Sequence, residues 1–82
     1  MRPLVCDGWL RVPYDGPELV PIYVATGPRT PAGEDGWKPA FLDWHEGRRV
    51  AQIRVPASRP GQVVKVWLRV DGNITNVGSV RL

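Results

Sequence analysis

The chain has 82 residues, eleven basic side chains against eight acidic ones, and a formal net charge of +3. This length predicts one small domain, whose single core leaves only a narrow margin of stability. The only cysteine, Cys6, excludes an internal disulfide, and with the only histidine, His45, it falls short of the roughly four ligands of a zinc site. We therefore expect self-association or docking on a larger assembly to add stability.

Charge is distributed unevenly along the chain. Residues 1–47 contain four basic and seven acidic side chains, whereas residues 48–82 contain seven basic side chains and one acid. Complementary strand sets within one sandwich would explain this asymmetry, and a bipolar surface that orients a partner is the sharper alternative. The basic residues alternate with expected core positions, and no nucleic-acid-binding motif is present, so we do not expect nucleic-acid binding.

The N-terminal sequence does not resemble a signal peptide, because Asp7 interrupts it before an apolar run develops. No apolar stretch approaches the roughly 20 residues that a membrane helix needs. Together with the lone cysteine, which suits a reducing compartment, these features predict a protein that is made in the cytoplasm and does not enter a membrane.

Nine prolines and nine glycines interrupt the chain so often that we expect short strands and turns in place of long helices. The first expected strand covers residues 8–12. Pro3 and Pro13 flank it, which favours a sheet edge because proline cannot donate to a strand ladder. The second expected strand covers residues 19–26, where Pro21 again indicates an edge or a bulge.

A loop and two further strands follow. Residues 27–36 contain three glycines and two prolines, so they should form an exposed loop, and its length makes it a candidate contact element. Residues 37–44 form the third expected strand. A tight turn at residues 45–48 then leads into a strand at residues 49–55, in which apolar and polar side chains alternate.

The last third of the chain has the clearest strand pattern. Residues 63–70 alternate strictly, which is typical of a half-buried antiparallel strand. The expected inward set is Val64, Val66, Leu68 and Val70, and the expected outward set is Val63, Lys65, Trp67 and Arg69. Asp71-Gly72-Asn73 predicts a hairpin turn into a last strand with Gly78, Val80 and Leu82 inward. About six or seven short strands in all predict an all-β fold, a small antiparallel β-sandwich or barrel.

No combination of residues in the sequence predicts catalysis or a bound cofactor. His45 has no serine or cysteine nucleophile beside it, and we expect it to be a turn residue. The acidic pairs Glu34 with Asp35 and Asp43 with Glu46 lack the repeating oxygen-ligand spacing of a calcium loop. We therefore expect neither an enzyme nor a metal protein.

Trp67 stands between Lys65 and Arg69 on the expected outward face of residues 63–70. A second buried layer, or a surface ring shielded by the neighbouring cations, would explain this arrangement structurally. The functional alternative is an aromatic anchor in a protein interface, and stacking on a glycan is a further one.

A series of short sequence elements indicates a resemblance to a known group of proteins, in addition to a fold class. They are Val-Pro-Ile-Tyr-Val-Ala-Thr-Gly-Pro at 20–28, Gly-Trp-Lys-Pro-Ala at 36–40, Arg-Val-Ala-Gln-Ile-Arg-Val-Pro at 49–56, a Pro-Gly turn followed by Val-Trp-Leu-Arg-Val-Asp-Gly-Asn within 60–73, and Val-Gly-Ser-Val-Arg-Leu at 77–82. From residue 20 onward the chain thus resembles a group of short virion structural proteins of actinobacterial tailed phages. It departs from their pattern in its short first segment and in a loop without their additional apolar residues.

The resemblance implies an immunoglobulin-like sandwich that acts in the virion without enzymatic activity. The expected function is a capsid decoration or minor capsid protein that docks on the major capsid protein, as a homo-oligomer or bound to the lattice. A tail or head–tail junction component and a glycan-binding module are the alternatives. The expected partner contacts are Trp37, Lys65, Trp67 and Arg69, with Arg29, Glu34 and Asp35 of the 27–36 loop.

Overall fold

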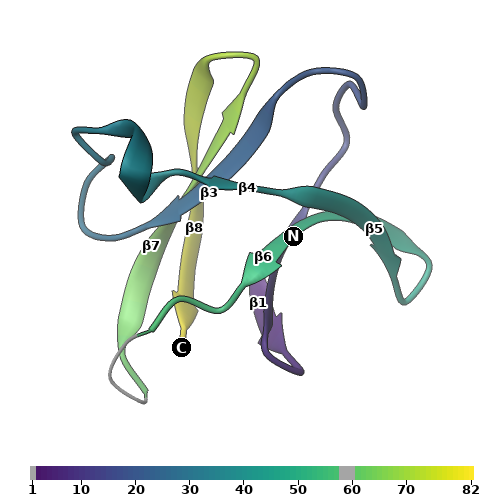
Figure 1. Cartoon of the computed structure of the whole chain (residues 1–82). Coiled ribbons are helices and arrows are strands. Elements are labelled where there is room, and N and C mark those ends of the chain that lie inside the picture. The colour runs from purple at the N-terminus through teal and green to yellow at the C-terminus, as the bar shows by residue number, and fades with distance from the viewer. Residues whose placement is uncertain (1, 58–60) are drawn as a thin grey trace.

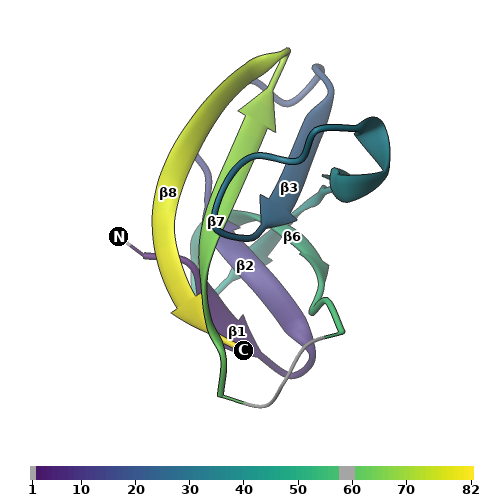
Figure 2. The ribbon, with the colours of Figure 1, turned by 90° about the vertical axis from the view of Figure 1, so that its left-hand side faces the viewer.

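The computed structural model describes residues 2–57 and 61–82, which form eight strands and one short 3-10 helix. The elements are β1 (Leu4–Cys6), β2 (Trp9–Pro13), β3 (Ile22–Thr26), η1 (Glu34–Gly36), β4 (Lys38–Pro39), β5 (Phe41–His45), β6 (Arg48–Arg54), β7 (Val63–Val70) and β8 (Asn73–Arg81). Sheet A has the order β1-β2-β6-β5 and sheet B the order β4-β3-β7-β8. The two antiparallel sheets form two layers whose strands cross (Figures 1 and 2). The predicted all-β sandwich is confirmed, with eight strands in the described residues.

Three hairpins share the same turn chemistry. Each turn is an acidic residue followed by glycine with positive φ at both positions, as type I′ turns require. The pairs are Asp7-Gly8 (55° and 82°), Glu46-Gly47 (52° and 78°) and Asp71-Gly72 (49° and 84°). The first of them joins β2 to the unpredicted strand β1, so β2 has neighbours on both sides. The predicted edge position of residues 8–12 is therefore wrong, and Pro13 is tolerated because it ends the strand.

The core lies between the two sheets and is built from small and medium-sized apolar side chains. The fully buried members are Leu10, Val12, Val24, Ala51 and Val66. The predicted inward face of β7 is confirmed, since Val66 is buried and Leu68 and Val70 pack against the core. Ile22 and Val24 of β3 are also buried and point inward. β3 begins directly after Pro21, so this proline interrupts no strand ladder.

The expected strand at residues 37–44 is divided between the two sheets. Lys38 and Pro39 pair with β3 in sheet B, whereas Phe41–His45 pair with β6 in sheet A. Ala40 lies at the crossing, donates its N–H to the carbonyl of Ile22 (2.9 Å) and packs against the core. A single continuous strand was thus the wrong prediction here, because Pro39 limits pairing and allows the chain to change layers.

A β-bulge in β8 changes which of its side chains reach the core. Val66 pairs with Gly78 and Trp67 with Asn76, which leaves Val77 as the extra residue. As a result both Val77 and Val80 pack against the core, whereas the regular alternation predicted Gly78 and Val80. The only helical element of the described residues is the short η1, and none of their helices is long and apolar enough to cross a membrane.

Candidate functional site

Several of the predicted contact residues meet on the outer face of sheet B. The guanidinium of Arg69 lies 4.4 Å from the ring centroid of Tyr23 and 4.9 Å from that of Trp37. It also donates two hydrogen bonds to the carboxylate of Glu34, at 3.0 and 2.9 Å. We call Tyr23, Glu34, Trp37 and Arg69 the Arg69 cluster. It is assembled inside one chain, so most of this surface is already occupied.

The 27–36 loop supplies the acid of this cluster and lies against the outer face of sheet B. Trp67 contributes to its attachment, because its indole N–H donates to the carbonyl of Gly27 at 3.1 Å. Trp37 is 6% exposed, and the side chain of Arg69 is 15% exposed. Trp37, Trp67 and Arg69 therefore hold the loop in place and offer little area to a partner.

The remaining predicted contact residues stay at the surface. Lys65 is exposed on β7, and Arg29 and Asp35 are exposed in the loop. Glu34 is also exposed, with 79% of its side chain accessible, although it is paired with Arg69. The hydrogen bonds from Arg69, and next its positive charge, lower the pKa of the Glu34 carboxyl. The same hydrogen bonds raise the pKa of Arg69.

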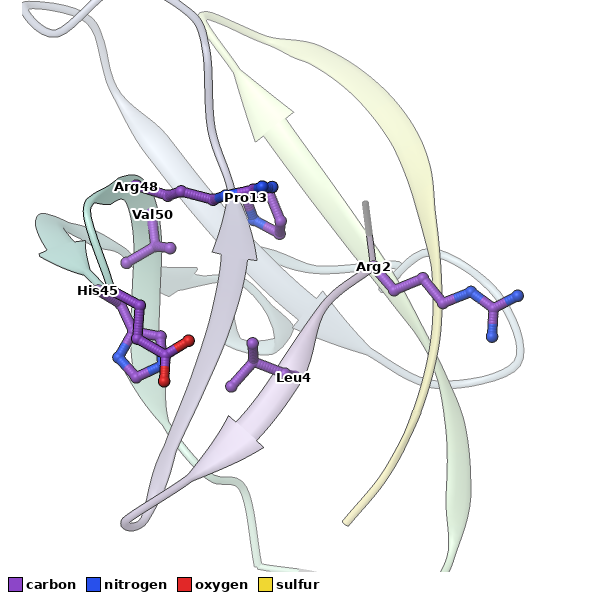
Figure 3. Close-up of a pocket in the computed structure, with 7 residues that line it drawn as sticks. Arg2, Leu4, Pro13, His45, Arg48 and Val50 are labelled. Carbon is purple, nitrogen blue, oxygen red and sulfur yellow. The ribbon is translucent and has the colours of Figure 1, made fainter.

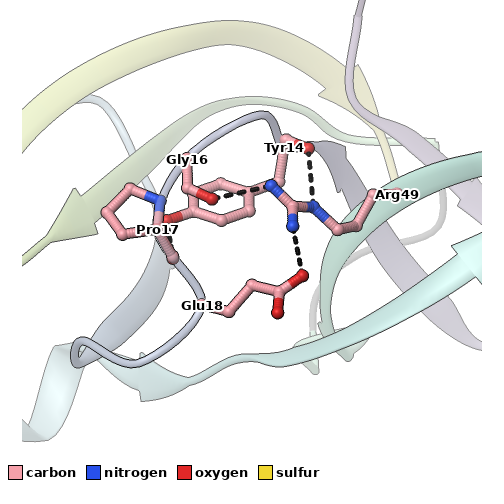
Figure 4. A network of polar contacts seen from close by, with 5 residues as sticks. All are labelled: Tyr14, Gly16, Pro17, Glu18 and Arg49. Atoms are coloured by element: carbon pink, nitrogen blue, oxygen red, sulfur yellow. Dashed lines mark hydrogen bonds and ion pairs between the residues drawn. The ribbon is translucent and has the colours of Figure 1, made fainter.

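A second polar network holds the loop between β2 and β3 and involves no residue that the sequence singled out. Tyr14 is 7% exposed, and its hydroxyl donates to the carbonyl of Pro17 at 2.5 Å. Arg49 of β6 donates to the carbonyls of Tyr14 (3.4 Å) and Gly16 (2.6 Å) and forms an ion pair with Glu18 (Figure 4). Burial raises the pKa of the Tyr14 phenol, while the charge of Arg49 opposes this rise.

These two networks explain part of the charge asymmetry along the chain. Glu18 and Glu34 belong to the acidic first half, and their partners Arg49 and Arg69 belong to the basic second half. Each sheet contains strands from both halves. The interpretation as complementary strand sets within one sandwich is therefore supported, because opposite charges are brought together inside the fold.

The outer face of sheet A carries a row of polar contacts that crosses three strands. Arg11 of β2 donates to the side-chain carbonyl of Gln52 on β6 at 3.2 Å, and Gln52 donates to the carboxylate of Asp43 on β5 at 3.4 Å. Beside this row the guanidinium of Arg54 lies 4.1 Å from the ring centroid of Trp9. Gln52 is consequently 7% exposed although it belongs to an outer face.

At the other end of this face is a hollow of about 330 Å³ that includes His45. Its lining residues are Arg2, Leu4, Pro13, His45, Glu46, Arg48 and Val50. Figure 3 shows that the guanidinium of Arg2 points away from the other labelled residues. The imidazole Nε2 of His45 lies 4.0 Å from a carboxylate oxygen of Glu46. These lining residues include no serine, threonine or cysteine that His45 could activate.

Cys6 and His45 lie on the same face of sheet A but at its opposite ends. Cys6 pairs with Trp9 at the start of β2. At the other end of β2, Pro13 pairs with Val50 of β6, and Arg48, two residues earlier in β6, pairs with His45. Four residues of strand, about 13 Å, thus separate the two positions along β2. The thiol of Cys6 contacts Asp7 at 3.5 Å. Among the described residues no group of three or more histidine, cysteine, aspartate or glutamate side chains could hold a metal.

The most exposed large apolar side chains lie on and beside the edge strand β5. Phe41 is 64% exposed, Trp44 is 70% exposed, and the neighbouring Leu19 is fully exposed. We call these three residues the β5 surface, in which Phe41 lies on one side of the strand and Trp44, beside Leu19, on the other. Trp44 also lines two shallow hollows, both of which include Arg49. This is the strongest candidate interaction surface of the described residues, because its apolar area is not covered by another element.

The sequence contained a signal for the β5 surface that the strand pattern obscured. Phe41 and Trp44 are three positions apart, so in one strand they must point to opposite faces. A sheet with one core cannot bury both. The edge itself is partly protected, because Asp43 accepts a hydrogen bond from the backbone N–H of Trp44 at 2.8 Å. Side chains, more than the strand edge, are therefore what this surface offers to a partner.

No protein-family model, no curated protein and no solved structure matches this chain.

Proposed function

We propose that the protein is a non-enzymatic structural component of a phage virion, a capsid decoration or minor capsid protein that docks on the major capsid lattice. The observation that carries docking is the β5 surface, where large apolar side chains are exposed on an edge strand of a domain of 82 residues. The virion as the place of docking rests on the sequence resemblance from residue 20 onward. Burial of this apolar area on assembled capsid would stabilise both partners.

The internal organisation of the domain supports a role as a rigid spacer. The long 27–36 loop is held by the Arg69 cluster, and the loop after β2 is held by Tyr14 and Arg49. Loops that are held in this way lose little conformational entropy when a partner binds. The loop after β2 includes Leu19, so this part of the β5 surface is presented in one fixed geometry, as a lattice of identical sites requires.

Co-sedimentation with capsids assembled from the accompanying major capsid protein tests this function. The protein is expected to co-sediment at near-physiological salt, and Trp44→Ser is expected to reduce the bound fraction. Ile74→Ser is the matched control, because Ile74 is also exposed (48%) but belongs to β8 of the other sheet. Absence of co-sedimentation would refute the capsid role. A closed ring of the protein alone, measured by light scattering, would instead support the tail or junction alternative.

The surroundings of Trp44 favour a second candidate function, a glycan-binding module. The hollow beside its exposed ring is also lined by Glu18, Asp43 and Arg49, which can accept or donate hydrogen bonds to hydroxyl groups. An exposed ring beside such groups suits stacking against a sugar. If oligosaccharides quench the tryptophan fluorescence of the wild type, and Trp44→Phe loses this quenching or shows less of it, the result would support this candidate over the first.

A further inference from the structure

A separate hollow of about 340 Å³ opens where the chain passes from β4 to β5. Its lining residues are Lys38, Pro39, Phe41, Ile53, Arg54, Val55 and Pro56. Phe41 forms part of its wall and is 64% exposed, whereas Ile53 is 3% exposed and belongs to the core. The hollow therefore offers an apolar bed, continuous with the core, for one apolar side chain of a partner.

The charge of this hollow distinguishes it from the other surface hollows. Both of its ionisable lining residues, Lys38 and Arg54, are basic. Each of three other hollows includes at least one carboxylate. The hollow beside His45 includes Glu46, and of the two hollows beside Trp44 one includes Asp15 and the other includes Glu18 and Asp43. A positive rim around an apolar bed attracts a ligand that combines apolar and negative groups.

The two rim cations are available to such a ligand in different ways. Lys38 is exposed, and it forms no ion pair with a described residue. Arg54 also lines the hollow, and its guanidinium is held 4.1 Å from the ring centroid of Trp9. An arginine that is oriented in advance loses less side-chain entropy when it binds a carboxylate.

We propose that this hollow binds an acidic and apolar polypeptide segment of the docking partner. One apolar side chain of the segment packs against Phe41, and flanking carboxylates contact Lys38 and Arg54. This inference rests on the proposed docking function and names the chemistry of the partner segment. Aromatic and arginine side chains at the centre of a contact are the residues that dominate interface energies, so a small site of this kind can determine specificity.

A synthetic peptide of alternating glutamate and leucine provides the probe, titrated into isotope-labelled protein while amide shifts are recorded by NMR. We expect the shifts to concentrate at residues 38–41 and 53–56. The same peptide with glutamine in place of glutamate should bind about tenfold more weakly, because it loses the charge-assisted contacts. Lys38→Glu should weaken the glutamate peptide to a similar degree, and added salt should weaken it further.

Matched variants separate this site from general attraction to a basic protein. Lys65→Glu reverses an exposed cation on β7, which does not line the hollow, and should leave peptide binding unchanged. Phe41→Ser should weaken both peptides, because it removes the apolar wall. Equal binding by Lys38→Glu and wild-type protein, equal binding of the two peptides, or shifts concentrated around Trp44 would each overturn the inference. A dimer without peptide, with the same residues shifted, would assign the hollow to a second copy and also overturn it.

Failure of this inference can be told from failure of the proposed function. If Lys38→Glu co-sediments with capsids as well as the wild type does, the hollow is not the docking site, while the capsid role stands. If the peptide binds as expected but the wild-type protein does not co-sediment with capsids, the capsid role is refuted and the acidic partner segment must belong to another protein.

Discussion

Trp37 and Trp44 are the most different of the four tryptophans in exposure, and replacing each by alanine tests the assignment of core and contact surface. Trp37 is 6% exposed and Trp44 is 70% exposed. A fully buried tryptophan removes roughly 200 Å² from water, and each Å² contributes about 25 cal/mol. The burial of these two side chains therefore contributes about 4.5 kcal/mol at position 37 and about 1.5 kcal/mol at position 44.

The unfolded chain already buries part of this area, which lowers the two contributions to about 3 and about 1 kcal/mol. In a domain of this size each kcal/mol shifts the midpoint of thermal unfolding by about 4–8 °C. Trp37→Ala should therefore lower the midpoint by about 12–24 °C, and Trp44→Ala by about 4–8 °C. Trp37→Phe, which keeps a ring for Arg69 to contact, should lie between the two.

Thermal unfolding followed by far-UV circular dichroism measures these shifts without relying on the fluorescence of the residues that are replaced. Should Trp37→Ala not fold at all, Trp37→Phe keeps the comparison with Trp44→Ala decisive. Equal losses for the two alanine variants, or a larger loss for Trp44→Ala, would refute the assignment of Trp37 to the folded interior and of Trp44 to the free surface.

Three further perturbations test the polar contacts and the backbone. Because Arg69 lowers the pKa of Glu34, this pair stabilises the fold above the ordinary carboxyl pKa, and its contribution is lost as the pH falls through the lowered value. Glu34→Gln should therefore remove this part of the acid dependence of the unfolding midpoint. A pH profile identical to that of the wild type would contradict this prediction. Tyr14→Phe removes the hydrogen bond to the carbonyl of Pro17 and should lower the free energy of unfolding in urea by about 1 kcal/mol. An unchanged free energy of unfolding would indicate that this bond does not form in solution. Gly78→Ala forces a side chain onto a φ of +117° and should cost about 1–3 kcal/mol in the same measurement, whereas a neutral result would contradict the bulge geometry.

The fold was predictable where its causes are local. The alternation of β7 identified its inward face, because a strand places successive side chains on opposite sides. The turn at Asp71-Gly72 was recognised from residue types that tolerate positive φ. The same chemistry at Asp7-Gly8 was overlooked, and with it strand β1. That omission turned the internal strand β2 into an expected edge.

The candidate site was less predictable, since exposure depends on which distant segment covers a face. The sequence singled out Trp67 and Arg69 because they point outward from β7. In the fold Arg69 binds Glu34, 35 positions away along the chain, and Trp67 binds Gly27, 40 positions away. The face they belong to is therefore partly covered by the 27–36 loop.

The sequence by itself determined the all-β class, the turns and the two faces of the regular strands, because side-chain alternation and glycine geometry act over a few neighbouring residues. Only the tertiary structure decided which outward faces remain exposed. The change of sheet at Ala40 leaves Phe41 and Trp44 uncovered on an edge strand, and the closure of the loop over sheet B withdraws Trp37 and Arg69 from the surface. Both outcomes depend on contacts between segments far apart in the chain, which no local pattern encodes.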